Sequence, residues 1–423
     1  MQVIERFRAL AAIPRCSFHA DAMLRYLAAE AERFGYGVHS DASGNLLCSR
    51  SEAVITLQAH YDMVCIGRAP ELELYETAGW LRARESTLGA DNGVGIAMML
   101  ELMAEGAPVE CLFTAEEEVG LLGARALELP LKPLPMLNLD SEEEGIVTIG
   151  CAGGVDLVAQ FPVECGEVRR HCYRVSVEGL PGGHSGVDIH RGIPNAIIEL
   201  ASRIEPGMEL VSIEGGERRN SIPRSASAVV ATTEPLEERE GYTSLGEQET
   251  TVIMGGEALL RMLREFRQGV RHYDETLGIV HSSINLALVA TEASGVRVQL
   301  SARAMAEATL RELERQTAEY FSKYGGRVKS EGFYAPWEPV NTPFSETVLA
   351  ATATRFPDAA FGAIHAGLEC GVIRERYPEI EMASIGPNIT EPHSSAEAVE
   401  IASVARVYEV VREVIRMRSA TSL

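Results

Sequence analysis

The sequence predicts an α/β fold with two folded parts: a discontinuous parent domain with a largely parallel sheet, and an inserted α+β domain. Three observations lead to this prediction. The chain has 423 residues, which is too many for one ordinary hydrophobic core. Both ends of the chain alternate short apolar, β-branched runs with amphipathic helical stretches, a pattern typical of α/β units. The middle of the chain instead has several strand-like runs of alternating polarity, which favours an antiparallel sheet.

The parent domain is predicted to comprise residues 1–165 and 332–423. Its predicted strands are the short apolar runs at residues 53–59, 109–114, 136–139 and 382–385. Its predicted helices lie at residues 21–34, 92–105 and 403–417. In the second of these helices, Val94, Ala97 and Met98 share one broad apolar face, which we expect to be buried in the core.

The inserted domain is predicted to comprise residues 166–331. Its predicted strands lie at residues 173–177, 226–232, 283–290 and 295–301, and its predicted helices at residues 256–268 and 304–323. This domain is inserted into the sequence of the parent domain, so the chain passes from the parent domain into it and then back. We expect it to serve as a lid and as a surface through which a homodimer forms.

Composition and charge argue against several classes of protein. Hydrophobic residues make up 46% of the chain and charged residues 23%, so we expect folded cores rather than disorder. The formal net charge of -23 repels phosphate backbones and anionic lipids, which argues against binding to nucleic acid or a membrane. Glu5, Arg6 and Arg8 interrupt the apolar stretch that a signal peptide needs. We therefore expect a cytoplasmic protein.

The eight cysteines are scattered along the chain without a Cys-x-x-Cys pair. They are Cys16, Cys48, Cys65, Cys111, Cys151, Cys165, Cys172 and Cys370. This spacing favours reduced thiols in a reducing compartment over a disulfide framework. Cys65 and Cys111 lie near the motifs described below, and we interpret both as small buried hydrophobic residues.

Histidine and acidic residues follow four of the predicted strands of the parent domain. They are His60 and Asp62 after residues 53–59, Glu116, Glu117 and Glu118 after residues 109–114, Asp140 after residues 136–139, and His393 a short loop after residues 382–385. In open α/β sheets, the crevice beyond the carboxyl ends of the strands is where ligands bind. Imidazole and carboxylate groups without thiolates suit catalytic zinc, with manganese or cobalt as substitutes. The sequence therefore predicts a metal site at this edge of the sheet.

Each of these residues also has a simpler interpretation when taken alone. His60 and Asp62 could form an ordinary hydrogen-bonded pair, and the three consecutive glutamates could be a solvated helix start. Asp91 precedes a predicted helix and could be its N-cap. The coincidence of these placements at one sheet edge favours the metal site. A carboxylate at a helix N-terminus stays ionised and can bridge two cations, so Asp91 is the candidate bridging ligand.

The same residues lie in motifs that resemble the co-catalytic zinc dipeptidases, the family that includes the aminoacyl-histidine dipeptidases. The matching motifs are LQAHYDMV at 57–64, TLGADNG at 87–93, EEVG at 117–120, NLDSEEEG at 138–145, GGHSG at 182–186, HAGLE at 365–369 and GPNITEPHS at 386–394. They are distributed over nearly the whole chain and occur in the order of the family. The segment between Asp62 and Asp91 is shorter than in aminoacyl-histidine dipeptidases, which affects the predicted substrate rather than the metal chemistry.

The resemblance implies a role for each residue at the predicted metal site. The implied ligands are His60 and Asp140 on one ion, Glu118 and His393 on the other, and Asp91 as the bridge between them. The residues alone do not distinguish among the three glutamates, but the family pattern of Glu-Glu, an apolar residue and Gly implies that Glu117 is the general base. Glu117 would activate a metal-bridging water, and Asp62 would orient the imidazole of His60.

Residues of the middle segment and one later loop are implied to contact the substrate. By resemblance, His184 stabilises the oxyanion, and Arg303 binds the terminal carboxylate of the peptide. Asn220, His365 and Gly367 are further substrate-binding candidates. For His184, Asn220 and the loop at 365–369, a purely structural role in turns is the alternative interpretation.

The predicted function is two-metal-dependent hydrolysis of the amide bond of short peptides, with Xaa-His dipeptides as one candidate substrate class. The same dinuclear site also serves N-acyl amino acid amidases, aminopeptidases and carboxypeptidases, which differ only in their substrate contacts. A catalytically silent metal or peptide binder is a third alternative. Glu117 argues against it, because a binder needs no base beside the metal.

Overall fold

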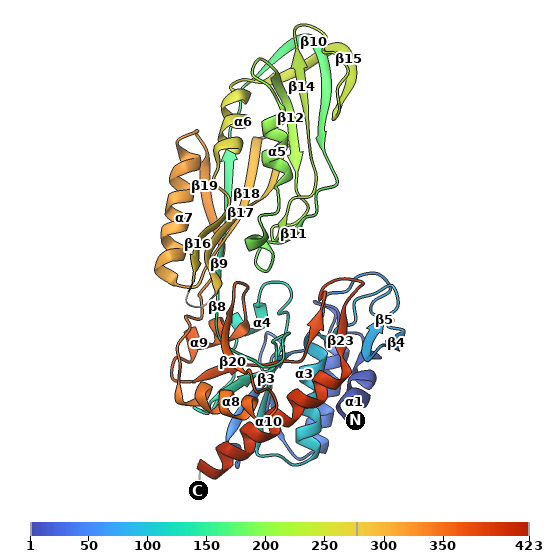
Figure 1. The fold of residues 1–423 in the computed structure, drawn as a ribbon, viewed down its shortest axis with the longest axis vertical. Coiled ribbons are helices and arrows are strands. Elements are labelled where there is room, and N and C mark those ends of the chain that lie inside the picture. Colours follow the sequence, from blue (N-terminus) through green and yellow to red (C-terminus); the bar gives the residue numbers. More distant parts are fainter. Residues whose placement is uncertain (1, 276–277, 422–423) are drawn as a thin grey trace. The chain divides into compact units, whose positions relative to one another are not determined.

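The computed structural model describes residues 2–275 and 278–421, and the chain divides into two compact units (Figure 1). Unit 1 comprises Met1–Cys151, Trp337–Ala363 and Leu368–Leu423, and unit 2 comprises Ala152–Pro336 and Ile364–Gly367. The sequence predicts divisions after residues 165 and 331, but the units divide after Cys151 and after Pro336. The reason is strand pairing: β9 (Gly153–Phe161) pairs with β19 (Arg327–Tyr334), and both belong to the sheet of unit 2.

Unit 1 is built on an eight-stranded sheet. Its strands, in spatial order, are β1 (Gly37–Ser40), β2 (Leu46–Ser49), β6 (Val109–Thr114), β3 (Ile55–His60), β7 (Met136–Asn138), β21 (Met382–Ser384), β8 (Ile146–Cys151) and β20 (Ala360–Ile364). The central strands β6, β3, β7 and β21 run parallel, and β2 and β8 join them in antiparallel orientation. Because the central strands are parallel, their carboxyl ends meet at one edge of the sheet.

Helices surround this sheet and form a hydrophobic core with it. They are α1 (Gln2–Ala11), α2 (Asp21–Arg33), α3 (Ala90–Ala104), α4 (Leu122–Arg125), α8 (Pro343–Ala353), α9 (Glu369–Arg376) and α10 (Ile401–Thr421). Helix α3 is buried on all sides from Asn92 to Met103, because its residues are almost entirely apolar or small. Phe7 of α1, Met98 of α3, Leu57 of β3 and Val411 of α10 belong to the same core.

A second, smaller sheet of unit 1 positions one of the predicted metal ligands. Its order is β22 (Ile389–Thr390), β23 (Ala398–Glu400), β5 (Trp80–Ala83) and β4 (Leu74–Thr77). The turn that connects β22 with β23 contains His393. The pairing of β23 with β5 ties this turn to the segment that precedes α3.

Unit 2 contains a nine-stranded sheet and its own core. The strands are β15 (Tyr242–Ile253), β10 (Cys165–Val177), β14 (Ala226–Thr232), β12 (Glu209–Gly215), β17 (Ile279–Glu292), β18 (Gly295–Ala304), β9 and β19 in spatial order, with β16 (Gly269–Asp274) paired to β17. Helices α5 (Ala196–Arg203) and α6 (Gly256–Glu265) pack over β10, β12 and β14, and α7 (Glu307–Ser322) packs over β9, β18 and β19 (Figure 1). Strands β11 (Gly183–His184) and β13 (Ser221–Ile222) pair antiparallel in a separate two-stranded sheet, and η1 (Ile189–Arg191) follows β11.

The predicted fold class is confirmed: the central parallel strands and the antiparallel sheet of the middle segment both occur. The predicted strand at 109–114 coincides with β6, and the one at 226–232 with β14. The predicted helix at 304–323 corresponds to α7. Among the described residues, no helix combines the length and the apolar composition that crossing a membrane requires. The actions of unit 2 as a lid and as a dimer surface stay predictions.

The prediction of reduced thiols is wrong for two cysteines, because Cys16 and Cys65 form a disulfide bond. The other six cysteines are free, and of these only Cys165 is exposed. Sequence spacing could not reveal the pair, because the partners lie 49 residues apart and outside any motif. The two segments meet through backbone contacts, in which the Ser17 N–H donates to the Met63 carbonyl and the Met63 N–H to the Arg15 carbonyl.

Candidate metal centre

The parallel strands of unit 1 bring the predicted ligands to one edge of the sheet. His60 is the last residue of β3, and β3 lies between β6 and β7. Glu117 and Glu118 follow the end of β6 by a few residues, and Asp140 follows the end of β7. Asp91 reaches the same edge from the first turn of α3, where its peptide bond to Asn92 is cis.

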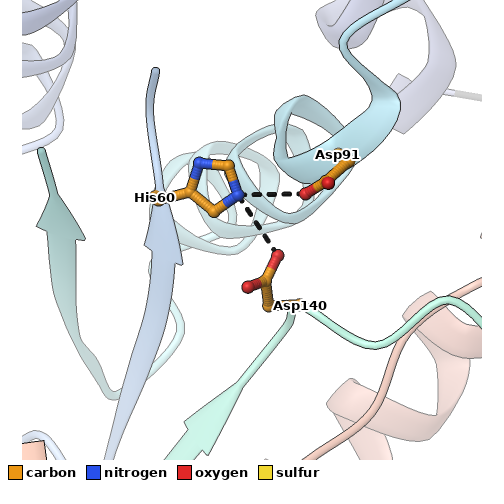
Figure 2. A group of neighbouring side chains, drawn as sticks. All are labelled: His60, Asp91 and Asp140. Atoms are coloured by element: carbon orange, nitrogen blue, oxygen red, sulfur yellow. Dashed lines mark hydrogen bonds and ion pairs between the residues drawn. The ribbon is translucent and has the colours of Figure 1, made fainter. Parts of the chain in front are cut away.

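The first group of predicted ligands surrounds His60 (Figure 2). The His60 Nε2 atom lies 3.0 Å from Oδ1 of Asp91 and 3.4 Å from Oδ1 of Asp140. Figure 2 shows the imidazole at the end of β3 with one ring nitrogen facing both carboxylates. Asn92 donates from Nδ2 to Oδ1 of Asp140 and to the carbonyl oxygen of Leu139, which fixes the Asp140 side chain from the α3 side.

The second group of predicted ligands surrounds His393. Its Nε2 atom lies 3.0 Å from Oδ2 of Asp91 and 2.8 Å from Oε2 of Glu118. The two oxygens of Asp91 therefore face two different histidines, His60 and His393. This is the arrangement that a carboxylate needs to bridge two cations, one in each group.

The carboxylates of the two groups lie close enough to repel one another, and bound cations would offset this repulsion. Burial, together with the neighbouring charge of Asp91, raises the pKa of Glu118 to about 7, and burial also raises the pKa of Asp140. Although burial opposes it, the surrounding carboxylates raise the pKa of His393 to about 11. Among the described residues, Oε1 of buried Glu118 has no hydrogen-bond partner. A cation would satisfy this oxygen and relieve the repulsion between the carboxylates.

Asp62 connects the end of β3 to the segment that carries the glutamates. Its carboxylate accepts hydrogen bonds from the backbone N–H groups of Glu117 at 3.0 Å and Glu118 at 3.3 Å, and from the Ser17 hydroxyl at 2.8 Å. The Nδ1 atom of His60 lies 3.2 Å from the Asp62 carbonyl oxygen and 3.5 Å from its carboxylate. Because Nδ1 faces Asp62, Nε2 of His60 faces the other carboxylates, as a metal ligand must.

Glu117 lies beside His60 and Glu118, with ligand-type atoms of the three residues all within 4.8 Å of one another. Burial raises the pKa of Glu117 well above its ordinary value, and the nearby charge of Glu118 adds to the effect. A carboxylate with a raised pKa accepts a proton more readily at neutral pH than an exposed one. This environment suits a general base.

The predicted residues of unit 2 occupy defined environments within that unit. Nδ1 of His184 accepts hydrogen bonds from the backbone N–H groups of Gly186 and Val187, at 3.3 and 3.2 Å. The neutral His184 ring therefore carries its proton on Nε2, which makes that atom a donor. Asn220 is exposed, and its backbone carbonyl accepts a hydrogen bond from the N–H of Ser185.

Arg303 and Gly367 share one neighbour, Tyr334. Nη1 of buried Arg303 donates to the Tyr334 hydroxyl at 2.9 Å. A Cβ atom added to Gly367 would lie 3.1 Å from the Tyr334 ring. His365 is also buried, with Nε2 2.7 Å from the Ser283 hydroxyl oxygen, and burial followed by the charge of Arg303 lowers its pKa to about 3. His365 is therefore neutral at physiological pH.

Two residues that support the centre were not predicted. Arg15 is buried, and its guanidinium donates to the carbonyl oxygens of Asp62 and Gly89. Glu397 is buried as well, and it accepts hydrogen bonds from the backbone of residues 88–91. The position of Glu397, four residues after His393, was the only available signal. For Arg15 there was none, because its partners lie 46 or more residues away.

Comparison with known proteins places this centre in a family. A model of the family described as Peptidase family M20/M25/M40 matches residues 56–417, which include every predicted ligand. The chain belongs to this peptidase family. A relative, the cytosol non-specific dipeptidase of Escherichia coli (strain K12), is 30% identical over 466 residues, covering 97% of this chain and 96% of the relative. The resemblance inferred from the motifs is thereby confirmed.

Solved structures of two peptidases share the fold over nearly the whole chain. The crystal structure of aminoacylhistidine dipeptidase from Vibrio alginolyticus matches with a TM-score of 0.76 and 27% identity, covering 98% of this chain and 96% of that one. A tripeptidase from Staphylococcus aureus matches with a TM-score of 0.62 and 16% identity, covering 99% and 98%, and shows likeness of fold alone. The family membership and the clustered ligands identify this chain as a metal-dependent peptidase.

Proposed function

We propose that this chain is a cytoplasmic dipeptidase that uses two divalent cations, preferentially zinc, to hydrolyse the peptide bond. The observation that carries the proposal is Asp91, whose two carboxylate oxygens face His60 and His393 separately. The names of two relatives support the substrate class and the compartment: one is a cytosol non-specific dipeptidase and another an aminoacylhistidine dipeptidase. Xaa-His dipeptides are accordingly the first substrates to try.

Five residues would hold the two cations. His60 and Asp140 would bind one ion, Glu118 and His393 the other, and Asp91 would bind both. Nitrogen and oxygen ligands without a thiolate favour zinc, and manganese or cobalt are the substitutes that the same ligands accept. When bound, the cations would polarise the scissile carbonyl and acidify the attacking water.

The remaining side chains would move protons and orient groups. Glu117 would accept the proton of the attacking water and deliver it to the amine that leaves. Asp62 would bind Nδ1 of His60 and the backbone N–H of Glu117. These contacts would keep the base Glu117 at a fixed distance from the ligand His60. His184 would donate from Nε2 to the developing oxyanion, and Arg303 would bind the peptide's carboxylate. Both roles, like those of Asn220, His365 and Gly367, rest on the family resemblance.

The three consecutive glutamates provide a matched experiment, because the same substitution can be made at each of them. Glu117→Gln should lower kcat for dipeptides on the order of 10³-fold while the metal content stays at two ions per chain, because the base is lost and the ligands remain. Glu118→Gln should lose metal as well as activity. Glu116→Gln is the control, because this half-buried side chain accepts a hydrogen bond from the Phe18 N–H instead.

Metal content by elemental analysis and product release from a dipeptide panel would measure these outcomes. If Glu117→Gln removed the metal and Glu118→Gln did not, the assignment of base and ligand would be reversed. If the wild-type protein released amino acids from N-acetyl amino acids but not from dipeptides, an amidase would replace the dipeptidase. The panel includes Xaa-His and β-alanyl peptides, so that it also reports the preferred substrate.

A further inference from the structure

The loop that precedes the bridging aspartate is held by one buried carboxylate. Glu397 is 2% exposed, and its Oε2 atom accepts hydrogen bonds from the N–H groups of Leu88 at 2.7 Å and Gly89 at 3.0 Å. Its Oε1 atom accepts from the N–H groups of Ala90 at 2.8 Å and Asp91 at 3.4 Å. Both oxygens of one side chain thus satisfy four consecutive backbone donors, the last of them on Asp91 itself.

These donors need a partner from elsewhere in the chain. The first N–H groups of a helix have no acceptor within the helix, and α3 begins at Ala90. The N-cap residue, Gly89, has no side chain that could accept a hydrogen bond. A buried backbone donor without a partner costs about 1–3 kcal/mol. Glu397 therefore supplies what the local sequence lacks.

The backbone carbonyl oxygen of Gly89 in the same loop is held by an arginine side chain. The guanidinium of Arg15, which is 1% exposed, donates through Nη2 to the Gly89 carbonyl oxygen and through Nη1 to that of Asp62 at 3.1 Å. Gly89 has a φ of 68°, and a Cβ atom there would lie 2.5 Å from Nη2 of Arg15. Glycine is required at this position, because a side chain would displace the guanidinium.

The position of the loop matters because Asp91 must satisfy two constraints at once. Its two oxygens each lie 3.0 Å from a different histidine, so a shift of its backbone would disturb both contacts. Groups that orient metal ligands typically affect metal affinity 10- to 100-fold when they are removed. Glu397 and His393 belong to the same short segment between β22 and β23, so this segment supplies one ligand and fixes another.

We propose that Glu397 is a positioning residue for the metal-bridging Asp91, acting through the backbone of residues 88–91 and set against Arg15 on the other side. The inference rests on the proposed two-metal function. In Glu397→Gln, one arm of the side chain becomes an NH₂ group that faces backbone donors and cannot accept from them. The loop then loses the bonds of that arm, and Asp91 is no longer held in the geometry that both ions require.

The experiment compares metal binding by the folded wild-type, Glu397→Gln and Glu397→Asp proteins. Zinc affinity is measured by competition with a chromophoric chelator, and the visible absorption of the cobalt-loaded protein reports ligand geometry. We expect Glu397→Gln to bind zinc 10- to 100-fold more weakly and to show an altered cobalt spectrum, with partial recovery in Glu397→Asp, which keeps both acceptor oxygens. Excess zinc should restore much of the lost dipeptide hydrolysis.

The control is Glu101→Gln, which alters another buried carboxylate on the same helix, where Glu101 pairs with Arg6. This variant should lose thermal stability without a change in zinc affinity or cobalt spectrum. Equal zinc affinity in wild-type and Glu397→Gln proteins would overturn the inference. If Glu397→Gln does not fold, equal affinity in Glu397→Asp would overturn it instead. A wild-type protein that binds fewer than two ions would refute the two-metal proposal rather than this inference.

Discussion

At the scale of single residues, burial raises the pKa of several carboxyl groups of unit 1, and Glu369 is one of them. Glu369, at the start of α9, accepts hydrogen bonds from Gln58 Nε2 at 2.5 Å and from the Thr114 hydroxyl at 2.6 Å, both to its Oε2 atom. Its Oε1 atom has no hydrogen-bond partner among the described residues. Burial raises the pKa of Glu369 to about 8. The structure therefore accommodates the protonated form better than the charged one.

This raised pKa predicts that the Glu369→Gln variant depends less on pH than the wild-type protein. Between its ordinary pKa of 4.5 and the folded value of about 8, Glu369 is protonated when folded and ionised when unfolded. The contribution of Glu369 to wild-type stability therefore falls as the pH rises through this window, by on the order of 4–5 kcal/mol. Glutamine mimics the protonated acid, so the metal-free variant should become the more stable of the two near pH 8. Urea unfolding at pH 5 and pH 8 would measure this, and parallel shifts in both proteins would contradict it.

The side chains of the centre differ in how far sequence could predict them. His60 and Asp140 could be placed at the sheet edge because each follows a strand that an apolar run defines, whereas only the family resemblance separated Glu118 from its two neighbouring glutamates. Arg15 and Glu397 were not predictable, because their side chains bind backbone groups. Almost every residue type has the same backbone groups, so the sequence does not show which of them a side chain will bind. The role of Glu397 became visible only when the four N–H groups of residues 88–91 could be traced to it.

At the scale of elements, the central strands were predictable and the outer ones were not. Strand β6 is buried throughout, so its apolar run stands out in the sequence. Strand β15 is exposed along most of its length and pairs only with β10 at the edge of its sheet, so its sequence has no apolar alternation. The divisions between the units were misplaced for a related reason, because β9 and β19 join their sheet through pairing across more than 150 residues. Such pairing is decided by the fold and not by local sequence.

The disulfide bond joins two segments that lie far apart in the chain, one after α1 and one after β3. The bond closes a loop of 49 residues in the unfolded chain, which predicts a stabilisation of about 2–4 kcal/mol. Reduction, or the double change Cys16→Ser and Cys65→Ser, should lower the melting temperature of the metal-free protein. Cys165→Ser is the control, because Cys165 is free and exposed. An unchanged melting temperature after reduction would contradict the expected stabilisation.

At the scale of the whole molecule, each unit has its own large hydrophobic core, and these two cores share no residue. All predicted metal ligands belong to unit 1, and so do both tryptophans, Trp80 and Trp337. Far-UV circular dichroism reports the strands and helices of both units. Tryptophan fluorescence therefore reports the unfolding of unit 1 selectively.

This distribution predicts how metal removal affects unfolding. A ligand that binds only the folded state stabilises it by about 2.7 kcal/mol at a concentration 100 times its dissociation constant. Zinc should therefore raise the midpoint of the fluorescence transition, and a chelator should lower it. The midpoint of the unfolding transition of unit 2, followed by circular dichroism, should shift less. Equal shifts of both signals, with a single shared midpoint, would show instead that the two units unfold together.

Two cations at Asp91 are proposed to perform the hydrolysis, and zinc titration of the metal-free protein tests this proposal. The measurement follows the rate of dipeptide hydrolysis as zinc is added in steps to a known concentration of protein. We expect no hydrolysis without metal and a maximal rate at two ions per chain, one for each of the histidine groups that flank Asp91. Full hydrolysis in the presence of a chelator, or a maximal rate at a single ion per chain, would contradict it.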